Sequence, residues 1–368
     1  MRIAVLSCHT PSLFWFRMDM MQSFLKSGHT VYAVGNETEA KWSGKFAAQG
    51  IAYKQILVQR NGMNPLNDLR TLFSIKRVLQ QIKPDKIFTF QAKTVIYGGL
   101  AANILGITDV YPMIAGLGSL FLKDSLKAKF VRGILTTEYR IALRKCPVIF
   151  FQNQDDRETF QGNGILRRQK VVMLHGSGVN TGRFEAQPLP ERFGFLCISR
   201  LIRDKGVYEY LEACKRTKEN YPQVRCLLVG PYDSNPSALK PEELRAYIED
   251  GTIEYFGEQE DVRPYLGQCH VFILPSYREG TPKTVLEAMS SGRAVITTDA
   301  PGCRETVVDG ENGYLVPIKD IDALCRRMEQ FILDPALAGE MGRDGRRKAE
   351  KIFDVKLVNE KICEAMGV

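Results

Sequence analysis

Short runs of aliphatic and branched residues recur along the chain, and segments with helical spacing separate them. In the first half the runs lie at residues 3–7, 30–34, 87–90, 148–151 and 171–174. In the second half they lie at residues 193–199, 225–229, 253–256, 271–274 and 294–297. Continuous apolar runs between helices are typical of parallel strands that are covered on both faces. The pattern therefore predicts an α/β chain with two doubly wound, Rossmann-like sheets.

The length of 368 residues also predicts two domains, because a typical domain has about 100–200 residues. The glycine-rich stretch HGSGVNTG, residues 175–182, suits a connection between two cores. We therefore expect an N-terminal domain at residues 1–180 and a C-terminal domain at residues 181–368. The last helix, from about residue 354, can pack back on the N-terminal domain. Ligands bind beyond the carboxyl ends of parallel strands, so the expected site is a cleft between the two sheets.

The composition excludes several classes of protein. No run approaches the ~18 apolar residues of a membrane span, and the first apolar run is too short for a signal peptide. The nine cysteines form no C-x-x-C pair, and no histidine cluster has metal-ligand spacing. Neither a disulfide framework nor a zinc site is indicated. We expect a cytoplasmic protein.

Positive charge is concentrated in the first half of the chain. Residues 1–180 carry 24 Lys and Arg against 11 Asp and Glu, whereas the remainder carries 26 against 31. Within the basic half, residues 123–145 place Leu, Phe and Ile at helical spacing among cations. This segment suits either an ordinary soluble helix or a helix on an anionic membrane surface. No known RNA-binding pattern accompanies the charge, so we do not expect a nucleic-acid partner.

The stretch LPSYREGTPKTVLEAMSSG, residues 274–292, leads from a strand into a helix. Thr281 suits the N-cap, and Pro282 suits the first helical position because the missing N–H would be unpaired there anyway. The helix should end near Ser291, before the glycine that follows it.

The start of this predicted helix is a candidate anion site. The amides of Lys283 and Thr284, beside Gly280, lie at the positive end of the helix dipole, and a phosphate group fits that geometry. The dipole contributes only about 0.3–1 kcal/mol, so cationic side chains must complete the site. Arg200 and Lys205 follow another strand, where they can bind a diphosphate through charge-assisted hydrogen bonds.

Two glutamates flank the same helix start. Glu287 lies three residues after Thr284 and therefore on the same helix face. Its carboxylate only accepts hydrogen bonds, which suits a pair of ribose hydroxyls. Glu279 lies on the turn, where it can accept from the hydroxyls of a bound sugar.

This arrangement resembles the E-x7-E signature of retaining glycosyltransferases of the family-4 type, which have the two-domain GT-B fold. The matching stretches are SRLIRDKG (199–206), LLVG (227–230), YFGEQEDV (255–262), LPSYREGTPKTVLEAMSSGRAVITTD (274–299) and GCRETVVDGENGYLVP (302–317). The resemblance implies two Rossmann-like domains that face an interdomain cleft, with a UDP-sugar bound to the second domain. It implies catalytic roles for Arg200, Lys205 and Glu279, and donor-binding roles for Gly280, Thr281, Lys283, Thr284 and Glu287.

Four further stretches narrow the resemblance: FWFRMDM (14–20), YGGLAANILGI (97–107), AGLGSLF (115–121) and GPYDSNPSALKPEEL (230–244). Together they are similar to bacterial transferases that add an N-acetylhexosamine to a polyprenyl-diphosphate-linked sugar, α-1,3-N-acetylgalactosaminyltransferases among them. The resemblance implies a membrane-facing, acceptor-binding N-terminal domain and a peripheral location on the inner face of the bacterial cell membrane. It leaves the transferred sugar, GalNAc or GlcNAc, open.

One departure from these relatives concerns a turn of the N-terminal domain. Many of them have a histidine in the turn where this chain reads Phe90-Gln91-Ala92-Lys93. In those relatives the histidine contacts the donor sugar, and Gln91, Lys93 or His9 can take over that contact. We also place these three residues in the acceptor-binding site. Arg17 can bind the acceptor diphosphate or form a structural salt bridge.

Two glycine and aspartate patterns admit other interpretations. Gly116-Leu117-Gly118 is not a dinucleotide-binding fingerprint, because Phe121 replaces the third glycine. Gly118 and Ser119 suit a turn near the donor phosphates or a purely structural turn. Asp320-Ile321-Asp322 imitates a metal-binding D-x-D, but Asp is favoured at helix starts in any case. We expect no metal and no cofactor beyond the UDP-sugar substrate.

The expected reaction follows from the resemblance. The acceptor attacks the sugar on the face that the diphosphate leaves, and the leaving phosphate oxygen takes the acceptor's proton. Arg200 and Lys205 stabilise the departing charge, Glu279 orients the sugar, and no protein nucleophile takes part. A UDP-sugar epimerase of the same fold and a non-catalytic sugar-nucleotide-binding protein remain as alternatives.

Overall fold

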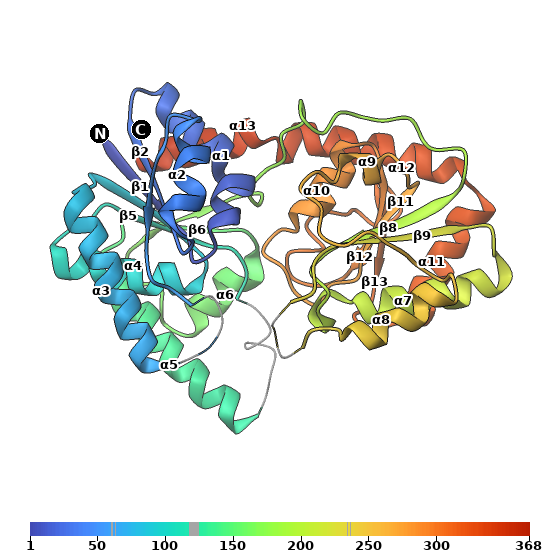
Figure 1. Ribbon diagram of the computed structural model, residues 1–368, viewed down its shortest axis with the longest axis horizontal. Helices are drawn as coiled ribbons and strands as arrows, with labels where there is room; N and C mark the ends of the chain where they lie inside the picture. Colours follow the sequence, from blue (N-terminus) through green and yellow to red (C-terminus); the bar gives the residue numbers. More distant parts are fainter. Residues whose placement is uncertain (60–61, 63, 118–124, 234, 236) are drawn as a thin grey trace. The chain divides into compact units, whose positions relative to one another are not determined.

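The computed structural model describes residues 1–59, 62, 64–117, 125–233, 235 and 237–368. The chain forms two compact units, each built on a parallel sheet (Figure 1). Unit 1 comprises Met1–Ser177 and Val355–Val368, and unit 2 comprises Gly178–Asp354. The first crossing between units thus follows Ser177, within the glycine-rich stretch 175–182 that was expected to connect the two cores.

Unit 1 alternates strands and helices along the chain. Its elements are β1 (Arg2–Leu6), α1 (Thr10–Lys26), β2 (Thr30–Gly35), α2 (Glu39–Ala47), β3 (Ala52–Gln55), α3 (Pro65–Ile82), β4 (Lys86–Phe90), α4 (Ala92–Leu105), β5 (Val110–Ile114), α5 (Leu126–Ala142), β6 (Val148–Phe151), α6 (Gln154–Gly162), β7 (Lys170–Met173) and α13 (Val355–Met366). Within the described residues the strands form a seven-stranded sheet in the order β3-β2-β1-β4-β5-β6-β7, and all its pairings are parallel.

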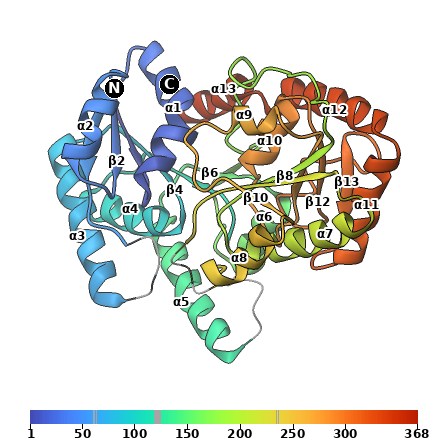
Figure 2. The same cartoon turned by 45° about the vertical axis from the view of Figure 1, so that its right-hand side comes forward.

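The sheet of unit 1 is covered on both faces, as the continuous apolar runs predict. Along β1, Ala4 and Leu6 contribute to the core shared with α3, α4 and α5. Ile3 and Val5 point the other way and join the core shared with α1, α2 and α13. Figure 2 shows these two groups of helices on opposite sides of β2 and β4. The helix α13 therefore belongs to unit 1, with its Ile362 side chain fully buried there.

Unit 2 repeats the same plan. Its elements are β8 (Gly194–Ile198), the short 3-10 helix η2 (Arg203–Lys205), α7 (Val207–Asn220), β9 (Arg225–Val229), α8 (Pro241–Glu249), β10 (Glu254–Tyr255), α9 (Arg263–Leu266), β11 (Val271–Leu274), α10 (Lys283–Ser290), β12 (Ala294–Thr298), β13 (Gly313–Val316), α11 (Ile321–Leu333), α12 (Ala336–Lys348) and the π-helical turn η3 (Ala349–Phe353). The described strands form a six-stranded sheet in the order β10-β9-β8-β11-β12-β13, again with all pairings parallel.

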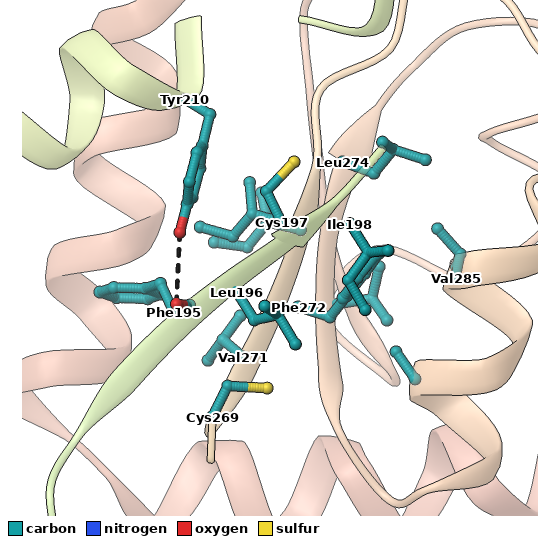
Figure 3. Packing of buried hydrophobic residues seen from close by; sticks show 14 of the residues in the cluster. Phe195, Leu196, Cys197, Ile198, Tyr210, Cys269, Val271, Phe272, Leu274 and Val285 are labelled. Carbon is teal, nitrogen blue, oxygen red and sulfur yellow. Dashed lines mark hydrogen bonds between the residues drawn. The ribbon is translucent and has the colours of Figure 1, made fainter. Parts of the chain in front are cut away.

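The strand β8 runs through the centre of the unit 2 core (Figure 3). Its residues Phe195, Leu196 and Cys197 are fully buried among apolar side chains from β11 and α10. Tyr210 of α7 packs on this core and donates its hydroxyl to the Phe195 carbonyl oxygen over 3.2 Å (Figure 3). A second bond of 2.9 Å joins the same hydroxyl to the Leu227 carbonyl oxygen. The Tyr210 hydroxyl therefore has hydrogen-bond acceptors although its ring is buried.

Three strands were not predicted from the sequence: β3, β5 and β13. β5 contains Pro112, which has no N–H for a sheet and argues against a central strand. Its pairing with β6 begins only at Met113, after the proline. β3 and β13 are four-residue strands at or near the ends of their sheets' order, and neither forms a long apolar run.

Candidate functional site

The predicted donor site lies where the strand order of unit 2 reverses. β8 pairs with β9 on one side and with β11 on the other. Residues 199–206 leave β8, and residues 275–282 leave β11, so both turns lie at the carboxyl ends of neighbouring strands. Doubly wound sheets bind their ligands at such a reversal of strand order.

The two turns contact each other through their backbones. The Tyr277 amide donates to the Asp204 carbonyl oxygen over 3.0 Å, and the Ser276 hydroxyl donates to the same oxygen over 3.2 Å. Gly206 has a φ of +70°, and a Cβ atom there would clash with the Pro275 carbonyl group. Glycine is therefore required at this crossing of the turns.

An ion pair between Lys205 and Glu279 joins the two turns at the side-chain level. The side chains are 19% and 13% exposed, so the pair is largely withdrawn from solvent. Arg200, at the end of β8, donates from Nη1 to Oδ2 of Asp233 over 2.7 Å. The predicted cations and the predicted sugar-binding glutamate thus lie at one edge of the sheet.

The helix α10 begins one residue later than predicted. Lys283 is its first residue, and Pro282 rather than Thr281 occupies the N-cap position, with φ −71° and ψ 109°. The amides of Val285 and Leu286 donate to the Pro282 carbonyl oxygen. A helix offers no internal acceptor to the amides before them, those of Lys283 and Thr284.

Contacts with residues 301 and 302 also fix the turn that carries Glu279. The Glu279 amide donates to the Pro301 carbonyl oxygen over 2.9 Å. Gly302 has a φ of +84°, and a Cβ atom there would clash with the carbonyl groups of Glu279 and Gly280. Gly280 is buried, whereas the other predicted donor-binding residues of this turn are half-buried: Thr281, Lys283 and Thr284.

Glu287 lies one turn into α10 and is only 7% exposed. No described residue donates a hydrogen bond to its carboxylate. Burial raises the pKa of Glu287 to about 7, although the charges of Lys283 and Arg183 oppose this rise and Asp261 adds to it. A buried carboxylate without a donor is an unfavourable arrangement unless a ligand supplies the hydrogen bonds.

Two acidic residues of this region were not predicted from the sequence. Asp233 follows β9 and is 10% exposed where it accepts the Arg200 guanidinium. Glu209 of α7 is 6% exposed and accepts the Tyr277 hydroxyl, which fixes the turn after β11 against α7. Asp233 lies within the stretch GPYDSNPSALKPEEL that carried the resemblance, but nothing in its local pattern indicated Arg200 as its partner.

Unit 1 has its own reversal of strand order, between β1 and β4. Gln91 lies there with a φ of +73°. Its Oε1 accepts from the Ser7 hydroxyl over 2.7 Å and from the Cys8 amide over 3.0 Å. Its Nε2 donates to the Ser12 hydroxyl over 3.3 Å, and that hydroxyl lies 2.8 Å from Nδ1 of His9. The structure therefore brings Gln91 and His9 together through one network.

The other two predicted acceptor-binding residues are engaged elsewhere. Lys93 forms an ion pair with Asp68 of α3, and both side chains are less than one-fifth exposed. Arg17 is 3% exposed, with its guanidinium carbon 4.7 Å from the centre of the Phe90 ring. No described carboxylate pairs with Arg17, and burial lowers its pKa to about 10. Such deep burial does not favour the predicted contact with an acceptor, and the predicted salt bridge is not formed with any described residue.

The remaining predicted segment of unit 1 is only partly described. Gly118 and Ser119 lie outside the described residues, as does the start of the basic segment 123–145. The rest of that segment is α5, on which three large apolar side chains are exposed: Leu126 (85%), Phe130 (71%) and Ile134 (47%). None of the helices in the described ranges is long and apolar enough to cross a membrane.

The aspartates of the D-x-D pattern have structural partners. Asp320 caps α11 by accepting from the Ala323 amide over 2.8 Å. Asp322 pairs with Arg216 of α7 over 2.7 Å. Across the described part of the chain, no group of three or more His, Cys, Asp or Glu residues is placed to hold a metal ion. All nine cysteines are free thiols.

Known proteins resemble this chain along most of its length. Residues 181–348 match the family model for glycosyl transferases group 1, and residues 2–153 match the model for glycosyl transferase 4-like domains. The N,N'-diacetylbacillosaminyl-diphospho-undecaprenol alpha-1,3-N-acetylgalactosaminyltransferase of Campylobacter jejuni is 26% identical over 363 residues, which cover 95% of this chain and 94% of the relative. The putative glycosyltransferase EpsD of Bacillus subtilis is 32% identical over 83% of this chain and 82% of its own length.

Solved structures share the fold over nearly the whole chain. Sucrose-phosphate synthase from Thermosynechococcus elongatus superposes with a TM-score of 0.82 at 17% identity, and the match covers 99% of this chain and 98% of that one. Anabaena Alr3699/HepE in complex with UDP-glucose superposes with a TM-score of 0.79 at 19% identity, over 100% of this chain and 99% of that one. At these identities the likeness shows the fold alone. The chain belongs to the glycosyl transferases group 1 family, and its two parallel-sheet units have the GT-B fold predicted from the sequence.

Proposed function

We propose that this glycosyltransferase takes an N-acetylhexosamine, GalNAc or GlcNAc, from a UDP-sugar that binds to unit 2. The observation that carries the proposal is the ion pair between Lys205 and Glu279, because it joins two turns predicted to bind the same donor. Lys205 keeps donors beyond the one that Glu279 accepts, since an ammonium group has three. Its charge and that of Arg200 then face the donor diphosphate at the carboxyl edge of the sheet.

Each part of the donor has a partner at this edge. The α10 amides of Lys283 and Thr284 donate to phosphate oxygens, next to Gly280 and Thr281. Glu287 accepts from the ribose hydroxyls, which supplies the hydrogen bonds that its buried carboxylate lacks in the described structure. The complexes of Alr3699/HepE with UDP and with UDP-glucose support a uridine nucleotide as the donor for this fold.

The reaction proceeds with retention and without a metal ion. The bond between the anomeric carbon and the diphosphate oxygen breaks while the acceptor hydroxyl attacks from the same face. The leaving phosphate oxygen takes the hydroxyl proton. Arg200 and Lys205 stabilise the charge that develops on the diphosphate, and the loss of one such donor can cost about 2.7–4 kcal/mol of activation free energy. Glu279 accepts from the sugar hydroxyls and orients the ring.

The acceptor in this proposal is a polyprenyl-diphosphate-linked saccharide. The names of two relatives support this class: that of the Campylobacter jejuni protein, and that of an Escherichia coli UDP-Gal:alpha-D-GlcNAc-diphosphoundecaprenol alpha-1,3-galactosyltransferase, which is 24% identical over 79% of this chain. The product would serve surface polysaccharide or glycoprotein glycan assembly.

The same proposal includes peripheral attachment to the inner face of the cell membrane. The helix α5 supports it, because exposed apolar side chains lie there beside Lys129 and Arg132. Replacing these two cations by Gln should weaken binding to anionic liposomes more than it lowers activity on a short-chain soluble acceptor. Equal loss of both would argue instead for damage to the fold.

The decisive experiment is a screen of UDP-sugars against several polyprenyl-diphosphate sugars, with products identified by mass and the new anomeric configuration by NMR. A hexosamine-sized mass increase with retained configuration is the expected result. Incubation without an acceptor distinguishes the alternatives: an epimerase would make a new UDP-sugar, and a non-catalytic binding protein would yield no product in any arm. Product formed with inversion would refute the retaining mechanism.

A further inference from the structure

Asp233 is a largely buried carboxylate that the proposed function leaves without a role. Its side chain is 10% exposed and accepts from Nη1 of Arg200 over 2.7 Å. Its other oxygen, Oδ1, accepts from the Asn235 amide over 2.8 Å. Both oxygens are therefore held, one by the turn that carries Asp233 and one by the guanidinium. Such a carboxylate can fix the orientation of the cation.

The loop that carries Asp233 is itself fixed to the turn that carries Arg200. The Leu201 amide donates to the Pro231 carbonyl oxygen over 3.0 Å, and the Leu239 amide donates to the Leu201 carbonyl oxygen over 2.8 Å. Gly230, at the start of the loop, crosses so close to Ser199 that a Cβ atom would clash with the Ser199 carbonyl group. The geometry of Asp233 relative to the end of β8 is thus set by backbone contacts.

The guanidinium of Arg200 is only partly used by this contact. Arg200 is 32% exposed, and among the described residues its guanidinium donates to Asp233 alone. A guanidinium has five N–H donors in one rigid plane, so a carboxylate on Nη1 leaves the donors of Nη2 and Nε available. Asp233 therefore binds one edge of the planar Arg200 guanidinium, and another edge can bind an anion.

We propose that Asp233 is a positioning residue that orients Arg200 toward the donor diphosphate. This inference rests on the proposed function, because it assumes that Arg200 binds the diphosphate. Without Asp233 the long Arg200 side chain would sample several rotamers, and ordering it would oppose donor binding. Once Arg200 has been replaced, a further replacement of Asp233 should therefore not weaken donor binding.

The test is a double-mutant cycle on the full chain, with UDP as the probe and affinity measured by calorimetric titration. Asp233→Asn keeps the shape and leaves an oxygen for the Asn235 amide, but it removes the charge that holds Arg200. Asp233→Ser serves as a second variant if the first lowers the midpoint of thermal unfolding. Glu243→Gln is the matched control, because Glu243 pairs with Arg203 in the same region over 2.6 Å and both side chains are more than one-third exposed.

We expect Arg200→Ala and Asp233→Asn each to weaken UDP binding about tenfold, and the double variant to bind UDP no more weakly than Arg200→Ala. Glu243→Gln should change the affinity less than about twofold. Equal losses from Asp233→Asn with and without Arg200 would overturn the inference, since they would show a structural role for the loop. Unchanged or tighter UDP binding by Asp233→Asn would also overturn it. A wild-type chain that binds no UDP would refute the proposed donor, and the inference with it.

Discussion

Replacing Glu287 by Gln should stabilise the protein at alkaline pH. Burial raises the folded-state pKa of Glu287 from 4.5 to about 7, so the folded chain favours the protonated carboxyl. The stability supplied by this group is complete below pH 4.5 and is lost as the pH rises to 7. A difference of about 2.5 pKa units corresponds to roughly 3 kcal/mol of unfolding free energy above pH 7. Gln is neutral at every pH, and it avoids this cost.

The assay is denaturant unfolding of wild-type and Glu287→Gln protein at pH 5 and pH 8. Both tryptophans, Trp15 and Trp42, lie in unit 1, so the unfolding of unit 2 should be followed by circular dichroism or calorimetry. We expect the variant to gain about 2–3 kcal/mol relative to wild type between the two pH values. Glu249→Gln, at an exposed site on α8, controls for the loss of one negative charge. A difference between variant and wild type that does not change with pH would refute the reasoning.

The same carboxylate should make UDP binding depend on pH. Ribose hydroxyls donate to the ionised form, so below pH 7 binding must first displace a proton from Glu287. The affinity for UDP should therefore fall by up to about tenfold per pH unit below that value. The phosphates of UDP titrate in the same pH range, so their contribution must be subtracted. Calorimetric titration of Glu287→Gln with UDP measures it. A wild-type dependence identical to that of the variant would exclude Glu287 from the ribose site.

Three further results are expected. Lys205→Ala should lower turnover about a hundredfold or more without changing the circular dichroism spectrum, and near-normal turnover would remove Lys205 from the mechanism. Gly302→Ala should cost about 2 kcal/mol or more in denaturant unfolding, because its Cβ atom would collide with the backbone at Glu279. Gly251→Ala is the control, because Gly251 has a φ of +74° and open space around the added atom, and it should cost only about 1 kcal/mol. An equal loss of unfolding free energy in both variants would show that the backbone at Glu279 moves to avoid the collision. Transferase activity should survive EDTA, and a strict requirement for a divalent ion would contradict the proposed metal-free chemistry.

The sequence predicted the fold well where local pattern and global structure agree. The buried strands of both sheets form continuous apolar runs, and the boundaries of β6, β9 and β11 were predicted to the residue. β5 was missed because Pro112 is unfavourable in a central strand, and only the register with β6 shows how it is accommodated. The start of α10 was placed one residue early, because Pro at the first helical position is the common arrangement and here it takes the N-cap instead.

Some features of the candidate site could be predicted from the sequence, and others could not. The turns after β8 and β11 could be predicted as neighbours, because parallel strands bring their carboxyl ends to one edge. The carboxylates that accept Arg200 and Tyr277 could not, since Asp233 and Glu209 are separated from these partners by more than 30 residues and follow no spacing rule. The burial of Glu287 was also missed: the sequence indicates its helix face but not how deeply that face is covered.

Because α13 packs in unit 1, the core of unit 1 can be completed only at the end of synthesis. Its Val358 and Ile362 side chains fill the core beside Met20 and Phe24 of α1, which leave the ribosome more than 300 residues earlier. On that side of the nascent sheet α1 and α2 can already pack, but the place of α13 stays uncovered until all of unit 2 has been translated. The amino-terminal half can therefore reach its final packing only after the other half has had time to fold, and a fragment that stops at Ser177 should expose an apolar surface and aggregate.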